Sequence, residues 1–406
     1  MHILALTHLF YPARGGTELA LQEWACTLAG KGHRLTVVTS NQITLEDFRN
    51  PLPNTTLSRE ELWKGIRIIR LSLSPGQRSI LAKLGALALR SRLPGGDRIW
   101  FMNQLPYLPR MIRTACDLKP DLIYAVPFPT ATIYYASVAA RKLGCPWVIQ
   151  PHLHVRDINA SLETILRWIF PRASAILTNT WAEKNYLAQK GIPEKIIHPL
   201  GQGIDLDPLA GGEKGRFRNR YGLKDCPILL FLGRKVEHKG IDTILEAMPA
   251  IWKQNPETVL VLAGQSSPYF QNFFPAHPLF HDRHIICLDN FPDTDKADLL
   301  EACDVLILPS QVESFGVVFL EAWSKGKPVI GARIPAVEEM IRPEEDGLLV
   351  PYGDPQALSQ AVVRLLKDPE LRKAMGEKGR RKVFEKYEIA KVADQMEALF
   401  LSLCRS

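Results

Sequence analysis

The sequence predicts an α/β protein built from two doubly wound parallel sheets. Short apolar or β-branched runs alternate with helical patterns along the chain, as in parallel sheets covered by helices. The length of 406 residues is enough for two domains of roughly 200 residues each. A polar stretch rich in glycine follows Gly201-Gln-Gly-Ile-Asp205 and separates two series of apolar runs. We therefore expect one domain over residues 1–205 and a second over residues 206–388.

The first series begins with a short strand and a helix over about residues 17–30. Residues 41–61, which contain Pro51 and Pro53, are interpreted as a loop insertion. The strands expected in this half are 3–7, 35–39, 66–71, 122–125, 147–150, 175–178 and 195–198.

The second series has the same alternation and ends in three helical patterns. Its expected strands are 228–232, 259–263, 285–288, 305–308, 328–331 and 348–350. The final helices are expected at 355–367, 369–385 and 389–403, and the last of them has apolar residues at helical spacing.

Composition favours a protein of the cytosol. No signal peptide or membrane-spanning run is recognisable, and the seven cysteines are scattered without a C-x-x-C pair. The first 200 residues carry 24 Lys and Arg against 13 Asp and Glu, so the basic charge is concentrated in that half.

The stretch E-S-F-G-V-V-F-L-E at residues 313–321 follows an apolar run and Pro309-Ser310. A strand, a turn and a helix that opens on a small residue are typical of phosphate-binding turns in α/β proteins. Glu313 is expected beside the free amides of the helix start. Glu321 lies inside an apolar helix, so its carboxylate needs hydroxyl or cationic partners, either in a ligand or in an ordinary core ion pair.

Two further motifs accompany this stretch: Phe231-Leu-Gly-Arg-Lys-Val-Glu-His-Lys-Gly240, and Phe10-Tyr-Pro-Ala-Arg-Gly-Gly-Thr-Glu18. With them, essentially the whole chain resembles the retaining glycosyltransferases of family 4, which use nucleotide sugars. The resemblance implies the GT-B fold, in which two Rossmann-like domains face each other across a cleft. It also implies that the first domain binds the acceptor, that the second binds the donor, and that the C-terminal helix (389–406) packs back on the first.

The resemblance gives roles to individual residues. Arg234 and Lys239 are expected to hold the donor diphosphate, which needs positive charge to become a leaving group. Gly16, in a loop where a missing Cβ lets an amide approach a phosphate, is expected there too. The resemblance further implies that Glu313 binds hydroxyls of the sugar, that the amides of Phe315, Gly316 and Val317 hold sugar or phosphate, and that Glu321 takes the ribose hydroxyls.

His152 follows an expected strand, and the family has a histidine at this kind of position, near the transferred sugar. His152, His154 and Asp157 would alternatively suit a metal, although no further motif completes such a site. Asp205-Leu-Asp207 and Asp293-Thr-Asp295 are interpreted as linker and helix cap, so no metal is expected.

We therefore expect a metal-independent hexosyltransferase (EC 2.4 class) without a cofactor, acting in polysaccharide or glycolipid biosynthesis. A UDP- or GDP-sugar would be the donor, and a glycan, lipid-linked or small molecule the acceptor. Asp289-Asn290-Phe291 stands where the family commonly has a glycine, which leaves the base open. The alternatives are a GT-B epimerase or phosphorylase, or a nucleic-acid-binding protein, which would leave the two glutamates unexplained.

Residues 78–113 carry seven Lys and Arg against the single acid Asp97, with apolar residues at helical spacing. This composition suits peripheral contact with the inner face of a membrane, and equally a core-packed helix with a solvated basic face.

Overall fold

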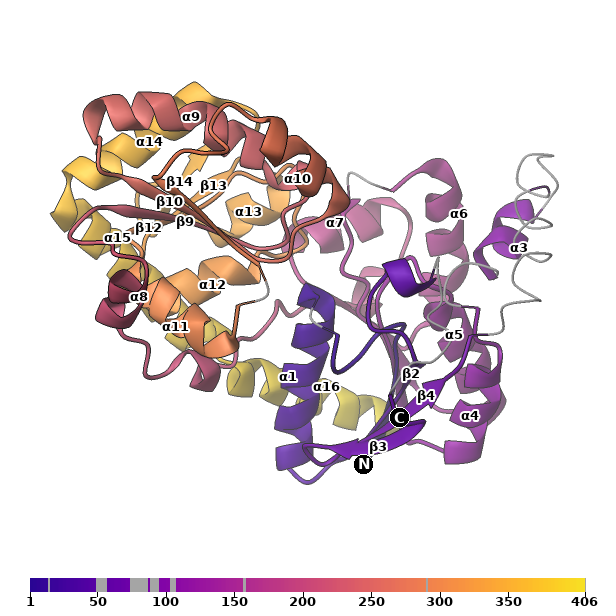
Figure 1. The fold of residues 1–406 in the computed structure, drawn as a ribbon. Coiled ribbons are helices and arrows are strands. Elements are labelled where there is room, and N and C mark those ends of the chain that lie inside the picture. The colour runs from indigo at the N-terminus through magenta and orange to yellow at the C-terminus, as the bar shows by residue number, and fades with distance from the viewer. Residues whose placement is uncertain are drawn as a thin grey trace. The chain divides into compact units, whose positions relative to one another are not determined.

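The computed structural model describes residues 1–13, 15–48, 57–73, 87, 95–102, 107–155, 158–289 and 291–405. The chain divides into two compact units. One unit consists of Met1–Gly203 together with Ile389–Ser406, and the other of Ile204–Glu388 (Figure 1). The division therefore lies two residues before the boundary expected from the sequence, and the last helix belongs to the first unit.

The first unit contains an eight-stranded sheet in the order β3-β4-β2-β1-β5-β6-β7-β8. All neighbouring strands are parallel except β3 and β4. The strands are β1 (His2–Leu6), β2 (Arg34–Ser40), β3 (Glu60–Trp63), β4 (Ile66–Leu71), β5 (Leu122–Ala125), β6 (Trp147–Ile149), β7 (Ala175–Thr178) and β8 (Ile197–Pro199).

Strand β3 corrects the interpretation of residues 41–61 as a loop throughout. It is a polar edge strand that pairs antiparallel with β4 only, so it lacks the apolar run of a central strand. Lys64 and Gly65, both with positive φ, form the two-residue turn between the strands. This Lys-Gly pair was the available signal for a hairpin.

Helices cover the sheet of the first unit, and the C-terminal helix is among them. Lys31 at the end of α1 bonds Asp394 and Glu397 of α16, and the two helices lie side by side in Figure 1. Phe400 of α16 is fully buried against Tyr124 of β5. The described helices are α1 (Gly16–Gly30), α3 (Gly96–Met102), α4 (Arg110–Leu118), α5 (Ala131–Leu143), α6 (Ala160–Ile169), α7 (Trp181–Gln189) and α16 (Ile389–Arg405).

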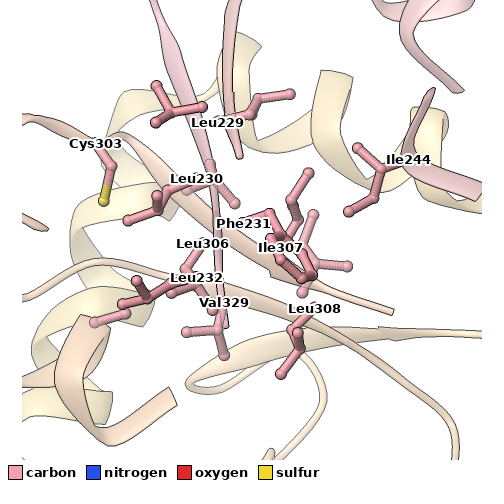
Figure 2. Packing of buried hydrophobic residues seen from close by; sticks show 14 of the residues in the cluster. Leu229, Leu230, Phe231, Leu232, Ile244, Cys303, Leu306, Ile307, Leu308 and Val329 are labelled. Carbon is pink, nitrogen blue, oxygen red and sulfur yellow. The ribbon is translucent and has the colours of Figure 1, made fainter. Parts of the chain in front are cut away.

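The second unit has six strands, all parallel, in the order β11-β10-β9-β12-β13-β14. Figure 2 shows apolar side chains of the central strands packed together with Ile244 of helix α9 (Ile241–Gln254) and with Cys303, which directly follows helix α11 (Asp293–Ala302). Both faces of these strands are covered, which explains their uninterrupted apolar runs. The strands are β9 (Ile228–Leu232), β10 (Val259–Ala263), β11 (Ile285–Leu288), β12 (Val305–Leu308), β13 (Val329–Ala332) and β14 (Gly347–Val350).

The helices of the second unit follow its strands. The helix expected at 369–385 ends earlier, at Lys382, and a π-helical turn (Val383–Tyr387) follows it. Among the described helices, none combines the length and the hydropathy that a membrane-spanning helix needs. The helices are α8 (Lys214–Arg220), α9 (Ile241–Gln254), α10 (Pro268–Phe273), α11 (Asp293–Ala302), α12 (Val317–Ser324), α13 (Pro335–Met340), α14 (Pro355–Lys367) and α15 (Pro369–Lys382).

Both sheets reverse their strand order at the first strand of the unit. β1 lies between β2 and β5, and β9 lies between β10 and β12. Ligands of doubly wound proteins bind at such reversal points, outside the carboxyl ends of the strands. In the second unit these ends lead into residues 233–240 and 309–316, which carry the sequence motifs.

Candidate active site

The loops after β9 and β12 pack directly against each other. The amide of Gln311 donates to the carbonyl of His238 at 2.8 Å. Gly240 has φ +73°, and a Cβ there would lie 2.4 Å from the carbonyl oxygen of Pro309. Because any side chain at position 240 would push the loops apart, glycine is required here for both conformation and packing.

Lys239 and Glu313, predicted from separate motifs, meet at this junction. Lys239 Nζ lies 2.5 Å from Glu313 Oε1, and Ser310 Oγ donates to the same oxygen at 2.9 Å. The side chains are 17% and 9% exposed, so water screens the pair only weakly. The pair holds the Glu313 carboxylate in one orientation at the sheet edge.

Arg234 lies in the same loop and is exposed. Its guanidinium has no ion pair with any residue that the structure describes. Arginine keeps its positive charge at all ordinary pH values and offers several donors in a fixed plane. It can therefore bind an anion without first giving up a protein partner.

Lys235, next to Arg234, has a different environment that the sequence did not reveal. It is fully buried, donates to the Leu288 carbonyl at 3.2 Å and to Asp289 Oδ1 at 3.1 Å, and lies over the ring of Phe270. Burial alone would raise the pKa of Asp289, but hydrogen bonds from Ser266 and Lys235 outweigh it and lower the pKa. Asp289, the first residue of the stretch Asp289-Asn290-Phe291, thus anchors a buried lysine.

The segment from Phe315 to Val317 forms the start of α12. Phe315 is buried against Tyr387, and Gly316 has φ +91°. Val317 is the first helical residue. The first amides of a helix have no partner within it, so the predicted amide donors lie at the end of β12 beside Glu313.

Glu321 is buried in α12, and its Oε1 accepts a hydrogen bond from Lys296 of α11. Its Oε2 is buried and has no partner among the described residues. The Glu321 carboxylate was expected to need a cationic or hydroxyl partner, and Lys296 provides one for Oε1 only. Sequence reasoning did not identify Lys296, because it comes from a different helix.

In the first unit, Gly15 directly precedes α1, and Gly16 is the first residue of that helix. A Cβ at Gly15 would lie 1.9 Å from Glu18 Oε2, whereas one at Gly16 would meet nothing within 4 Å. Glu18 lies 3.5 Å from Nε2 of His8, whose pKa is lowered to about 4 by burial. A side chain at Gly15 would displace the Glu18 carboxylate from its position, whereas Gly16 leaves open space at the helix start.

His152 follows β6, with φ +53° and little exposure. Its Nδ1 lies 2.9 Å from Nδ2 of Asn179, which follows β7, and 2.9 Å from Nε2 of Gln202, which follows β8. Burial, with a smaller effect of His154, lowers the pKa of His152 to about 3, so the ring is neutral near pH 7. Neither amide was identified from the sequence.

Within the described part of the chain, neither alternative metal site gains a further ligand. Asp157 lies outside the described residues, and Nδ1 of His152 already faces two amides. Asp205 accepts the Asp207 amide at 3.0 Å. The N-cap of α11 is Pro292, so the expectation that Asp293 caps this helix is wrong. Asp295 pairs with Arg220. Among described residues no group of three His, Cys, Asp or Glu side chains could hold a metal.

Residues 78–113 lie mostly outside the described part of the chain, and Asn290 does as well. Of the basic residues in that segment, Arg98, Arg110 and Arg113 are described. Arg98 lies 5.1 Å from the ring of Trp168, and Arg172 lies 6.0 Å from the same ring. Arg98 and Arg172 are exposed and Trp168 is half-buried, so two guanidiniums and an indole form a cluster at the surface of the first unit.

Two family models match the chain and together cover most of it. The model described as Glycosyl transferase 4-like domain matches residues 15–203, and the one described as Glycosyl transferases group 1 matches residues 213–382. The chain belongs to this glycosyltransferase family. It is therefore a transferase of the EC 2.4 class, and the second match spans both motif loops.

Curated relatives of this glycosyltransferase carry different names. An alpha-D-kanosaminyltransferase of Streptomyces kanamyceticus is 27% identical over 290 residues, covering 66% of this chain and 74% of the relative. A GDP-mannose-dependent alpha-(1-6)-phosphatidylinositol monomannoside mannosyltransferase of Mycolicibacterium smegmatis is 30% identical over 255 residues, covering 59% and 66%.

Solved structures establish the fold as GT-B. HepE of Anabaena, in complex with UDP and glucose, matches with a TM-score of 0.75 at 19% identity, covering 99% of this chain and 100% of that one. Sucrose-phosphate synthase of Thermosynechococcus elongatus matches with a TM-score of 0.76 at 21% identity, covering 99% and 98%. The predicted fold class is confirmed.

Proposed function

We propose that this glycosyltransferase moves a sugar from a nucleoside diphosphate sugar to an acceptor hydroxyl, with retention at the anomeric carbon and without a metal ion. The observation that carries the proposal is the Lys239–Glu313 pair at the reversal point of the second sheet, with the exposed Arg234 in the same loop as Lys239 and without an ion pair to any described residue. A cation for phosphate and an oriented carboxylate for hydroxyls are the groups that a sugar diphosphate needs.

The reaction breaks the bond between the anomeric carbon and a phosphate oxygen, which leaves with the electron pair. Arg234 and Lys239 stabilise the negative charge that develops on the diphosphate. The acceptor oxygen forms the new bond on the same face of the sugar, and its proton passes to the departing phosphate. The transition state resembles an oxocarbenium ion, as in glycoside cleavage generally.

The two glutamates bind different parts of the donor in this proposal. Glu313, already held by Lys239 and Ser310, accepts from hydroxyls of the sugar. Glu321 accepts from ribose hydroxyls through Oε2, the oxygen left without a partner among the described residues. The amides at the start of α12 and at Gly16 supply further donors to phosphate or sugar.

The compared proteins support a nucleotide sugar as donor without fixing which one. HepE was solved with UDP-glucose as well as with UDP and glucose, and the mycobacterial relative is named for GDP-mannose. The stretch Asp289-Asn290-Phe291 departs from the family pattern, and its Asp289 anchors Lys235 at the end of β11. We therefore leave the base and the sugar to experiment.

We propose a lipid-linked or otherwise anionic glycan acceptor for the first unit. The guanidiniums of Arg98 and Arg172 over Trp168 give this unit a cationic and aromatic cluster suited to phosphate headgroups. Sedimentation with anionic vesicles should pellet the protein at low salt and release it at high salt. An equal result with neutral vesicles would indicate that the contact is not electrostatic, and no pelleting would leave a glycan or small-molecule acceptor free in solution.

The proposed function is tested by incubating the enzyme with UDP-, GDP- and ADP-sugars and following release of the nucleotide. Proton NMR of the anomeric position at early times should show the configuration of the donor retained in the product. An inverted product would contradict the proposal. Epimerised donor, or sugar phosphate formed from a glycan and phosphate, would instead favour the epimerase or phosphorylase alternative.

A further inference from the structure

We propose that Asn179 and Gln202 are positioning residues, which hold His152 in the tautomer whose proton is on Nε2, so that it presents a hydrogen-bond donor to the transferred sugar. The inference rests on the proposed function for its substrate. It rests on the buried hydrogen bonds of the first unit for its chemistry. Three side chains that follow three neighbouring strands, β6, β7 and β8, meet at one nitrogen, Nδ1 of His152.

The direction of the hydrogen bonds is set deep in the core. Tyr124 is fully buried, and burial raises its pKa, so the hydroxyl keeps its hydrogen. Among the described residues, the acceptor for that hydrogen is Oε1 of Gln150. A buried hydroxyl hydrogen without an acceptor would cost about 1–3 kcal/mol, so Gln150 must turn its oxygen toward Tyr124.

The remaining bonds follow from this orientation. With its oxygen toward Tyr124, Gln150 points its NH₂ group at Oδ1 of Asn179, 3.0 Å away. Asn179 must then point its own NH₂ group at Nδ1 of His152, at 2.9 Å. A ring nitrogen that accepts cannot carry a proton, so the proton of the neutral imidazole is on Nε2.

Gln202 reinforces the same state from a different segment. Its Nε2 lies 2.9 Å from the same Nδ1, so two amide donors compete for one lone pair. The amide groups of Asn179 and Gln202 therefore both oppose protonation of Nδ1. Nε2 of His152 has no partner among the described residues, and this leaves its hydrogen available to a ligand.

The backbone around this network is fixed as well. The buried carboxylate of Glu183 accepts from the amide of Leu153 at 3.0 Å and from the amide of Asn179 at 2.7 Å. These two bonds tie together the segments after β6 and β7. They also help to hold His152 at φ +53°, a conformation that residues other than glycine seldom adopt.

The proposal is tested by long-range proton–nitrogen NMR of histidine labelled with ¹⁵N, in the full-length enzyme. The His152 signal is assigned by its loss in His152→Gln. In the wild type we expect a protonated Nε2 and an unprotonated Nδ1, unchanged between pH 5 and 9. In Asn179→Asp, a carboxylate replaces the donor, so we expect a proton on Nδ1, titration of the ring inside that range, and about a tenfold loss of kcat.

Asn159→Asp is the matched control. Asn159 caps α6 by accepting the amide of Leu162, a role that aspartate also fills, so both the spectrum and kcat should stay as in the wild type. A proton on Nδ1 of the wild type would overturn the proposal. An unchanged spectrum in Asn179→Asp would overturn it too, and unchanged kcat despite a changed spectrum would overturn the link to the sugar.

If Asn179→Asp does not fold, Asn179→Ala and Gln202→Ala serve instead. Each alanine variant leaves one donor, so the Nε2 proton should persist, whereas the double variant should show a mixture of tautomers. A wild-type spectrum in the double variant would overturn the proposal. Because these spectra need no substrate, failure to transfer any sugar would count against the proposed function and not against the tautomer.

Discussion

Lys239 and Glu313 are 74 positions apart in the chain and form an ion pair of 2.5 Å that joins the loops after β9 and β12. Lys239 is the residue predicted to bind phosphate and Glu313 is the residue predicted to bind the sugar, and the pair brings the two into contact. Donor binding therefore uses two side chains that are already paired with each other. Arg234, by contrast, has no ion pair with any described residue.

A double-mutant cycle should reveal this coupling. Lys239→Met leaves a poorly solvated carboxylate and should lower the free energy of unfolding by about 1–3 kcal/mol. Glu313→Gln should cost less, because its amide oxygen still accepts from Lys239. The cost of the double variant should fall short of the sum by about 1 kcal/mol in denaturant unfolding. Additive effects would show that the pair contributes no net energy.

Stability should fall on acidification because two buried histidines are neutral in the folded protein. Burial lowers the pKa of His152 to about 3 and of His8 to about 4, whereas unfolded histidine titrates near pH 6.5. Below pH 6.5 the unfolded chain therefore binds protons that the folded chain does not. Each histidine should lower the free energy of unfolding by on the order of 1 kcal/mol per pH unit toward pH 4.

Urea unfolding at pH 7 and pH 5 measures this effect, and His8→Gln isolates the contribution of one residue. The variant should lose less stability between the two pH values than the wild type does. Equal losses would mean that His8 is protonated in the folded state or titrates normally there.

The C-terminal helix should be essential to the first unit. Phe400 is fully buried beside Tyr124, so Phe400→Ala should destabilise the protein by about 3–5 kcal/mol. Gln395 lies on the exposed face of the same helix, and Gln395→Ala should be nearly neutral. Similar melting temperatures for the two variants would contradict the packing of α16.

Transfer should survive removal of divalent cations. Arg234 and Lys239 supply the positive charge that the diphosphate needs, so EDTA should leave the initial rate within about twofold of the untreated rate. Complete loss, restored by manganese, would return attention to Asp205, Asp207 and the histidines after β6. Added magnesium without EDTA is the control for effects of ionic strength.

The sequence was informative where the local pattern reflects the physics of a parallel sheet. Strands buried on both faces are uninterrupted apolar runs, so β5, β9, β10 and β12 were predicted with the bounds that they have. Strand β3 was missed because an edge strand needs no such run. The π-helical turn after Lys382 was missed because it continues the pattern of the helix before it.

The motifs identified side chains within each loop but not their partners. Lys296 reaches Glu321 from α11, a segment that only the folded sheet brings beside α12. Asn179 and Gln202 likewise reach His152 from the ends of two later strands. Such partners depend on strand order, which a single sequence does not specify.

Calorimetric titration of UDP, GDP and ADP measures whether the loops after β9 and β12 bind the diphosphate of a nucleotide sugar. The wild type should bind at least one of them. Arg234→Ala should weaken that nucleotide's binding by roughly 10- to 100-fold, the loss of one charge-assisted contact. The exposed Arg381 of α15 provides the matched control, and Arg381→Ala should bind as the wild type does. Equal affinity in Arg234→Ala and the wild type would contradict the account.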